Sequence, residues 1–190
     1  VAQSVWHKEL NNNRVPHKND SMRGSYLGPK FSQLEIESSL AKLGAVFKTF
    51  SEDEMLDTVA HSLSEGKAVG WFQGKMEFGP RALGGRSIIA DPRSPETQKT
   101  LNLKVKYRES FRPFAPSVLV GDTNEWFDLN VDSPYMLVVS PVKSDRRREM
   151  TKEENGLFGI DKLNIQRSEI PAVTHVDYSA RVQTVSRDTN

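Results

Sequence analysis

A glycine-rich, basic segment is the first part of the sequence where the residue types could do chemistry. Residues 74–87 read Gly-Lys-Met-Glu-Phe-Gly-Pro-Arg-Ala-Leu-Gly-Gly-Arg-Ser, with four glycines and three basic side chains. Glycine lets a backbone approach a ligand closely, successive N–H groups can form an anion nest, and arginine adds planar donors for phosphate. The Gly-Lys-Ser/Thr ending of a Walker A loop is missing. Two interpretations therefore stay open: an anion-binding loop, or a structural turn with surface arginines.

Positive charge accumulates in the residues that follow. Residues 81–112 contain eight cations and three carboxylates, although the whole chain has a net charge of only +1. Such a local excess predicts a site for a polyanion. Lys104, Lys106 and Arg108 alternate, so an extended segment would place them on one face, and Arg112 follows with the same parity. The alternative is an exposed basic edge strand, which protects against aggregation.

A polar segment near the end of the sequence offers groups for proton transfer. In residues 171–183, Thr174 precedes His175, and Asp177 follows two residues later. A histidine close to an aspartate could act as an acid–base pair. The competing interpretation is that His175 is a structural residue near a turn.

Other kinds of catalytic centre have little support. The four histidines show no metal-ligand spacing, so no metal-binding residue is assigned. The chain has no cysteine, which excludes a disulfide framework and fits a reducing compartment, so we expect a cytoplasmic protein. No Gly-x-Ser-x-Gly elbow occurs. No apolar run approaches the ~18 residues of a membrane span, so we expect no membrane partner.

Helix and strand patterns on either side must position these segments. Ser32 and Ser51 each begin a capping box, and an apolar stripe at helical spacing follows each serine as far as Gly44 and Gly66. A short helix is expected over residues 95–103. This alternation with strands predicts an α/β or α+β fold. The expected strands are 45–50, 67–72, 87–90, 116–120, 136–139, 172–176 and 181–185.

The remaining segments have a different character. We expect the compact apolar strand 67–72 to be buried on both faces, and the charged residues 143–169 to form a solvated loop. Residues 1–30 are rich in turn formers and predict a linker. The apolar content of 36% is low for a packed domain, so part of the chain is expected to remain unpacked. With 26 basic and 25 acidic residues, binding to nucleic acid is not favoured.

Taken together, the three polar segments resemble the NodU/CmcH family of O-carbamoyltransferases. Residues 70–84 are similar to the most characteristic segment of that family. The resemblance continues in the same order through residues 86–93, 111–116, 133–136 and 174–185. One departure is Gly85, where many members of the family have asparagine, so that a side-chain hydrogen bond is lost.

The resemblance implies a two-domain enzyme. Its N-terminal domain is Kae1-like and holds iron and the transfer chemistry. Its C-terminal domain is YrdC/Sua5-like, an open twisted mixed sheet with flanking helices, and converts carbamoyl phosphate and ATP into carbamoyl adenylate for transfer to a hydroxyl of a small-molecule acceptor. Residues 1–30 would then be a linker or the end of the Kae1-like domain. Residues 31–190 would be the YrdC-like domain, incomplete at its C-terminus, and this fragment alone is expected to be inactive in transfer.

The same resemblance implies an anion clamp for the phosphates of carbamoyl phosphate and ATP. Mg²⁺ could accompany ATP, held by phosphate oxygens and water. Two alternatives remain: an RNA-binding YrdC-like module, and a non-catalytic interaction domain. Catalytic roles are implied for Lys106, Arg112 and Arg181, and binding roles for Arg81, Lys104, Arg108, Met136, Thr174 and His175.

Overall fold

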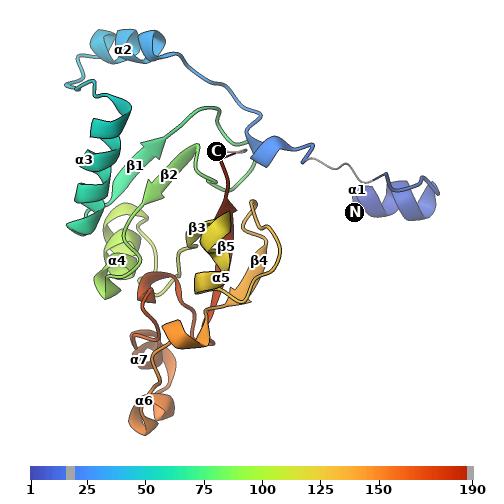
Figure 1. Ribbon diagram of the computed structural model, residues 1–190, viewed down its shortest axis with the longest axis vertical. Coiled ribbons are helices and arrows are strands. Elements are labelled where there is room, and N and C mark those ends of the chain that lie inside the picture. The colour runs from blue at the N-terminus through green and yellow to red at the C-terminus, as the bar shows by residue number, and fades with distance from the viewer. Residues whose placement is uncertain (16–19, 188–190) are drawn as a thin grey trace.

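The computed structural model describes residues 1–15 and 20–187 and confirms a mixed α/β fold with two small sheets (Figure 1). In the first sheet, β1 (Val69–Phe72) pairs antiparallel with β2 (Arg86–Ile89). The second sheet is mixed and has the order β3–β5–β4. Its central strand β5 (Ser179–Val185) runs parallel to β3 (Ser117–Leu119) and antiparallel to β4 (Val138–Pro141).

Both predicted capping boxes are present. Helices α2 (Gln33–Lys42) and α3 (Glu52–Ser64) begin after serines whose hydroxyls accept a hydrogen bond from the third helical N–H, while the glutamate at that position bonds back to the serine. Helix α4 (Pro95–Thr100) continues into a π-helical turn, Leu101–Val105. The helix and the turn together span the predicted helix 95–103. The remaining α-helices are short: α1 (Ala2–Ser4), α5 (Thr123–Trp126), α6 (Lys152–Gly156) and α7 (Gly159–Leu163).

The hydrophobic core lies against one face of the mixed sheet. Phe127, Val142 and Val182 are completely or almost completely buried, and Ala180 of β5 faces the same cluster. The described molecule nevertheless exposes 13772 Å², whereas a compact monomer of 21.4 kDa exposes about 9,100 Å². Part of the chain therefore remains unpacked, as the low apolar content predicts.

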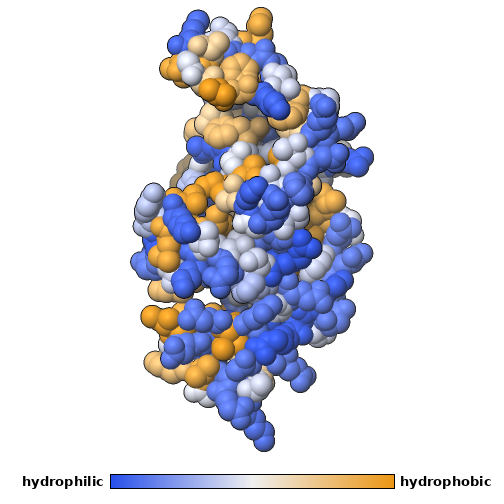
Figure 2. All heavy atoms as spheres, turned by 90° about the vertical axis from the view of Figure 1, so that its left-hand side faces the viewer, coloured by the Kyte–Doolittle hydropathy of each residue, from blue (hydrophilic) through white to orange (hydrophobic). Residues whose placement is uncertain are grey.

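Helices α2 and α3 account for much of this exposed surface. Neither helix has a buried residue, although each carries an apolar stripe. Figure 2 shows hydrophobic side chains gathered at the top of the molecule, where α2 lies in Figure 1. The amphipathic pattern thus predicts the two helices correctly, but the described chain covers their apolar sides only in part: Leu40 of α2 and Met55, Val59 and Leu63 of α3 are half-buried.

Three expectations about strands are wrong. Residues 45–50 are exposed and form no strand, because no neighbouring segment offers them a hydrogen-bonding partner. Strand β1 is shorter than predicted and alternates between half-buried and exposed residues, since β2 is the only strand that pairs with it among the described residues. Residues 172–176 do not form a strand: Pro171–Val173 is a 3₁₀ turn, as suits the fixed φ of proline.

Two further segments differ in detail. The strand expected at 136–139 begins later, at Val138, because Met136 has a left-handed backbone with φ of 53°. The charged segment 143–169 is more ordered than a solvated loop, since it contains α6, α7 and a 3₁₀ turn, Ser144–Arg146.

Part of the predicted linker 1–30 packs onto the glycine-rich loop. The N–H of Gly28 donates to the carbonyl of Met76, and the N–H of Phe78 donates to the carbonyl of Ser25. Residues 16–19 of this linker, like 188–190, lie outside the described residues. The domain boundary near residue 30 remains a prediction.

Replacing Phe127 tests where stability resides. Its side chain is 1% exposed in the core, so we expect Phe127→Ala to lower the free energy of unfolding by about 3–5 kcal/mol. The matched control is Phe72→Ala, at a residue that is 79% exposed, where a change below about 0.5 kcal/mol is expected. Urea denaturation measures both. Equal losses in the two variants would show that the mixed sheet is not the main core.

Candidate functional site

A buried carboxylate organises the glycine-rich loop. The Glu77 side chain is 0% exposed, and its Oε1 accepts hydrogen bonds from the N–H groups of Leu83 (2.6 Å), Gly85 (2.8 Å) and Arg86 (3.3 Å). Its Oε2 pairs with Nε of Arg86 at 3.2 Å. Burial alone would raise the pKa of Glu77, but the three N–H donors outweigh burial and hold this pKa below its ordinary value. Glu77 is therefore ionised at neutral pH.

The loop is attached at Leu83 to two distant parts of the chain. The carbonyl oxygen of Leu83 accepts from the Tyr26 hydroxyl at 2.5 Å and from Nε2 of Gln183 at 2.7 Å. Burial, followed by the nearby charge of Glu77, raises the pKa of Tyr26 to about 12, so the hydroxyl keeps its proton. These bonds place residues 77–86 against β5.

Strand β5 has one apolar and one polar face. Ala180 and Val182 belong to the core, so Ser179, Arg181 and Gln183 point to the opposite side of the strand. Because Gln183 bonds to the loop at Leu83, Arg181 is directed towards the same loop. The polar face of β5, defined by Ser179, Arg181 and Gln183, is the surface on which the site is built.

Arg181 of this face is influenced by the charge of a second arginine, Arg81. Burial, and then the positive charge of Arg81, lower the pKa of Arg181. Nε of Arg181 is buried without a hydrogen-bond partner. In the described part of the chain, no carboxylate forms an ion pair with either arginine. Two positive charges that influence each other and have no paired carboxylate favour an anion bound near them, because the anion would offset their repulsion.

His175 lies beside these arginines, in the turn before β5. The N–H of His175 donates to the carbonyl of Ser179, and Nδ1 lies 3.1 Å from Oγ of Ser179. The single hydroxyl proton of Ser179 is donated to Oδ1 of Asp177 at 2.7 Å. Nδ1 of His175 must therefore carry a proton and donate it to Ser179, which leaves Nε2 as the acceptor nitrogen.

The protonation of His175 follows from its surroundings. Burial lowers its pKa, the charge of Arg181 lowers it further, and Asp177 offsets part of this effect. His175 is thus neutral at pH 7. We refer to Arg81, Arg181 and this neutral His175 as the arginine cluster.

A second cationic segment has a different conformation from the predicted one. Lys104, Lys106 and Arg108 do not alternate on an extended strand, because Leu101–Val105 is a π-helical turn and Tyr107 has a left-handed backbone with φ of 48°. Lys104 and Lys106 are exposed. Val105 and Tyr107, which separate these cations, are residue types that strands favour, so the sequence alone does not exclude a strand here.

The side chain of Asn102 holds the two ends of this second segment together through hydrogen bonds. Its side chain is 0% exposed, donates from Nδ2 to the carbonyls of Ser110 (3.0 Å) and Arg112 (2.8 Å), and accepts at Oδ1 from Nε of Arg108 (2.6 Å). The Arg108 guanidinium also lies 5.0 Å from the centre of the Phe114 ring. Arg112 pairs with Glu109 at 2.8 Å on the surface. Among the described residues, no hydrogen bond or ion pair joins Lys106 or Arg112 to the arginine cluster.

The two remaining predicted residues lie in turns. The Thr174 hydroxyl is buried and bonds to the carbonyl of Ile170 (2.9 Å) and to Oγ of Ser168 (2.7 Å). Met136 is half-buried with the left-handed backbone already described, a conformation that costs a non-glycine residue free energy.

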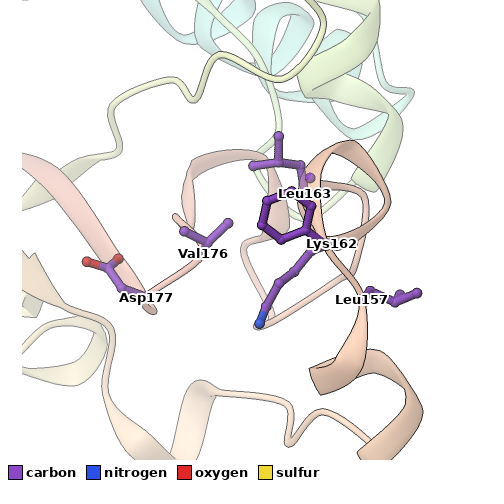
Figure 3. Close-up of a pocket in the computed structure, with 7 residues that line it drawn as sticks. Leu157, Lys162, Leu163, Val176 and Asp177 are labelled. Atoms are coloured by element: carbon purple, nitrogen blue, oxygen red, sulfur yellow. The ribbon is translucent and has the colours of Figure 1, made fainter.

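A shallow pocket of about 500 Å³ opens next to the His175 turn. Figure 3 shows Lys162 and Leu163 of α7 on one side, and Val176 and Asp177 on the other. None of the predicted site residues lines this pocket. Across residues 1–15 and 20–187, no group of three or more His, Cys, Asp or Glu side chains could hold a metal ion. Over the same residues, no helix combines the length and apolar content needed to cross a bilayer.

The sequence analysis missed Glu77, Asn102 and Gln183. For each of these polar residues, the neighbouring residues in the sequence indicate that the side chain could be buried. Glu77 is the only acidic residue within the glycine-rich segment 74–87. Asn102 stands between two leucines, and Gln183 between valine and threonine on a strand. A polar residue at such a position is buried only when its hydrogen bonds are satisfied.

Comparison with known proteins identifies the family of this chain. The family model described as "Carbamoyltransferase C-terminus" matches residues 60–190. The chain is similar to "Uncharacterized protein sll1178" of Synechocystis sp., with 56% identity over 192 residues, which cover 100% of this chain and 31% of that protein. It is 41% identical over 169 residues to "Nodulation protein NolNO" of Sinorhizobium fredii, covering 87% of this chain and 22% of NolNO.

A third relative carries an enzyme name. The "3'-hydroxymethylcephem-O-carbamoyltransferase" of Amycolatopsis lactamdurans is 40% identical over 129 residues, which cover 68% of this chain and 20% of that enzyme. This chain spans less than a third of the length of these relatives. The chain belongs to the carbamoyltransferase family and corresponds to its C-terminus.

Titration of His175 tests whether Arg181 and Asp177 lie close to it in the arginine cluster. NMR is expected to give a pKa below the ordinary value of 6.5. Arg181→Ala removes a neighbouring positive charge and therefore raises this pKa, whereas Asp177→Asn removes a negative charge and lowers it. Arg93→Ala, in an exposed pair with Asp91, is the control and leaves the pKa unchanged. An unaltered His175 titration in Arg181→Ala would mean that the two side chains are not neighbours.

Proposed function

We propose that this chain binds carbamoyl phosphate and ATP and forms carbamoyl adenylate, as the C-terminal part of an O-carbamoyltransferase. Two arginines without a paired carboxylate carry the proposal. Arg181 is half-buried on the polar face of β5, and its Nε has no hydrogen-bond partner. Burial, and then the charge of Arg81 a hundred positions earlier, lower the pKa of Arg181, and among the described residues neither arginine forms an ion pair. Phosphate oxygens supply the missing negative charge, and guanidinium groups bind them with paired hydrogen bonds.

The chemistry of adenylation explains why cations are needed. Transfer between phosphorylated substrates builds negative charge on the phosphate oxygens, and preorganised cations stabilise that charge. Arg181 is held by β5 and does not have to be reoriented. Lys106 and Arg112 reach the same phosphates from the second segment. Arg112 can leave Glu109, because an exposed ion pair contributes only about 0–1 kcal/mol.

The other predicted residues complete the clamp. Lys104 and Arg108 would add positive charge around the phosphates, while Met136, Thr174 and neutral His175 would contact the carbamoyl and adenine groups, outside the pocket lined by α7. The described residues provide no cluster of metal ligands, so Mg²⁺ would be carried by phosphate oxygens and water.

The rest of the reaction belongs to the longer protein. The relatives are more than three times the length of this chain, and one of them is named for carbamoylation of a hydroxymethyl group. We include in the proposal a Kae1-like partner domain with iron, a YrdC/Sua5-like architecture for this part, a hydroxyl of a small molecule as acceptor, and a cytoplasmic location where ATP is available. This chain alone would then form the intermediate without transferring it.

Calorimetry with ATP and with carbamoyl phosphate tests the proposal. Arg81→Ala and Arg181→Ala are each expected to weaken binding by about 10- to 100-fold, since a hydrogen bond to a charged group contributes about 1.5–3 kcal/mol. Lys106→Ala and Arg112→Ala should act in the same direction. Arg93→Ala, whose arginine is already paired with Asp91, is the matched control and should bind normally.

Two outcomes would contradict the proposed function. One is a calorimetric failure: either the unmodified chain binds neither ligand, or the control and the clamp variants bind ligand equally well. The other is RNA binding that falls steeply with salt while ATP binding is absent, which would favour the nucleic-acid alternative.

A further inference from the structure

The glycine-rich loop contains two arginines, Arg86 and Arg81, of which only Arg86 has a carboxylate partner in the described chain. Arg86 pairs with Glu77 through Nε and donates from Nη2 to the carbonyl of Gly79 at 3.0 Å. Arg81, at the exposed part of the same loop, has no ion pair or hydrogen bond of its own among the described residues. The charge of Arg86 is therefore neutralised inside the loop, and that of Arg81 remains available.

The bonds to Glu77 also fix the path of the backbone around Arg81. Three donors to Oε1 come from residues 83–86, while Glu77 itself lies before Gly79. Residues 78–82 thus form an arch whose two ends are held by one carboxylate. The arch has few other supports, because Phe78, Arg81 and Ala82 are exposed and only Leu83 at its end is buried.

The far side of the arch determines where Arg81 points. Leu83 bonds to Gln183, which is two residues from Arg181 on the same face of β5. Holding residues 83–86 against Glu77 therefore keeps the loop that carries Arg81 next to the face of β5 that carries Arg181. Without the carboxylate, three backbone N–H groups lose their acceptor and the arch can adopt many conformations, so that binding has to order it again.

We propose that Glu77 is a positioning residue, which reserves Arg81 for the anion by neutralising Arg86 and by closing the arch 78–82 at both ends. This inference rests on the proposed function, because Arg81 must bind phosphate for its position to matter. Glu77 itself does not touch the ligand: it acts through Arg81.

A double-mutant cycle separates positioning from simple stability. Glu77→Gln keeps the size of the side chain but removes its charge and turns a donor towards Arg86. We expect this variant of the full chain to bind ATP about tenfold more weakly. In the Arg81→Ala background the same substitution should change ATP affinity by less than about twofold, because the residue through which Glu77 acts is already absent. Glu149→Gln, at an exposed carboxylate, is the matched control and should leave ATP affinity unchanged.

A second variant covers the case in which Glu77→Gln does not fold. Arg86→Gln removes the partner of Oε2 and the bond to Gly79 at a side chain that is 36% exposed, and the cycle with Arg81→Ala is repeated. Additive effects of Arg81→Ala with both variants would overturn the positioning role while leaving the proposed function in place. If Arg81→Ala alone does not weaken ATP binding, both the proposed function at Arg81 and this inference are wrong.

Discussion

A carboxylate removed from water must have its oxygens bonded to donors, and this requirement at Glu77 shapes the whole site. Three backbone N–H groups and Arg86 satisfy it, which draws residues 83–86 back onto Glu77. Gly85 makes the approach possible: a Cβ there would lie 2.6 Å from the carbonyl oxygen of Lys75. A relative with a side chain at this position must hold that carbonyl elsewhere, which gives the departure at Gly85 a structural consequence.

Local signals in the sequence were sufficient for elements that are held by local bonds. The capping boxes at Ser32 and Ser51 form as predicted, because each involves residues only three positions apart. The alternation around Arg181 also predicted a strand, and its parity places Val182 in the core and Arg181 on the opposite face. From the resemblance, Arg81 and Arg181 were assigned to one clamp, and this assignment stays a prediction, although the charge of Arg81 contributes, after burial, to the lowered pKa of Arg181.

Features that depend on distant partners could not be predicted in this way. Residues 45–50 have the composition of a strand, but a strand needs a neighbour, and the sequence does not show whether one is available. The period of two at Lys104 and Lys106 is compatible with a strand and with a tight helical turn. Asn102 decides between them, because its amide can satisfy the carbonyls of Ser110 and Arg112 only if the segment folds back.

Glu77 and Asn102 solve the same problem in two separate loops. Each is a buried polar side chain that uses its hydrogen bonds to close a loop and to engage one arginine, Arg86 or Arg108. Each thereby leaves another cation, Arg81 or Lys106, exposed and without an ion pair in the described chain. A local excess of positive charge does not by itself make an anion site, since neighbouring carboxylates can neutralise it. Which cations remain available to an anion is decided by these two buried side chains, so the proposed phosphate site would depend on residues that need not contact its ligand.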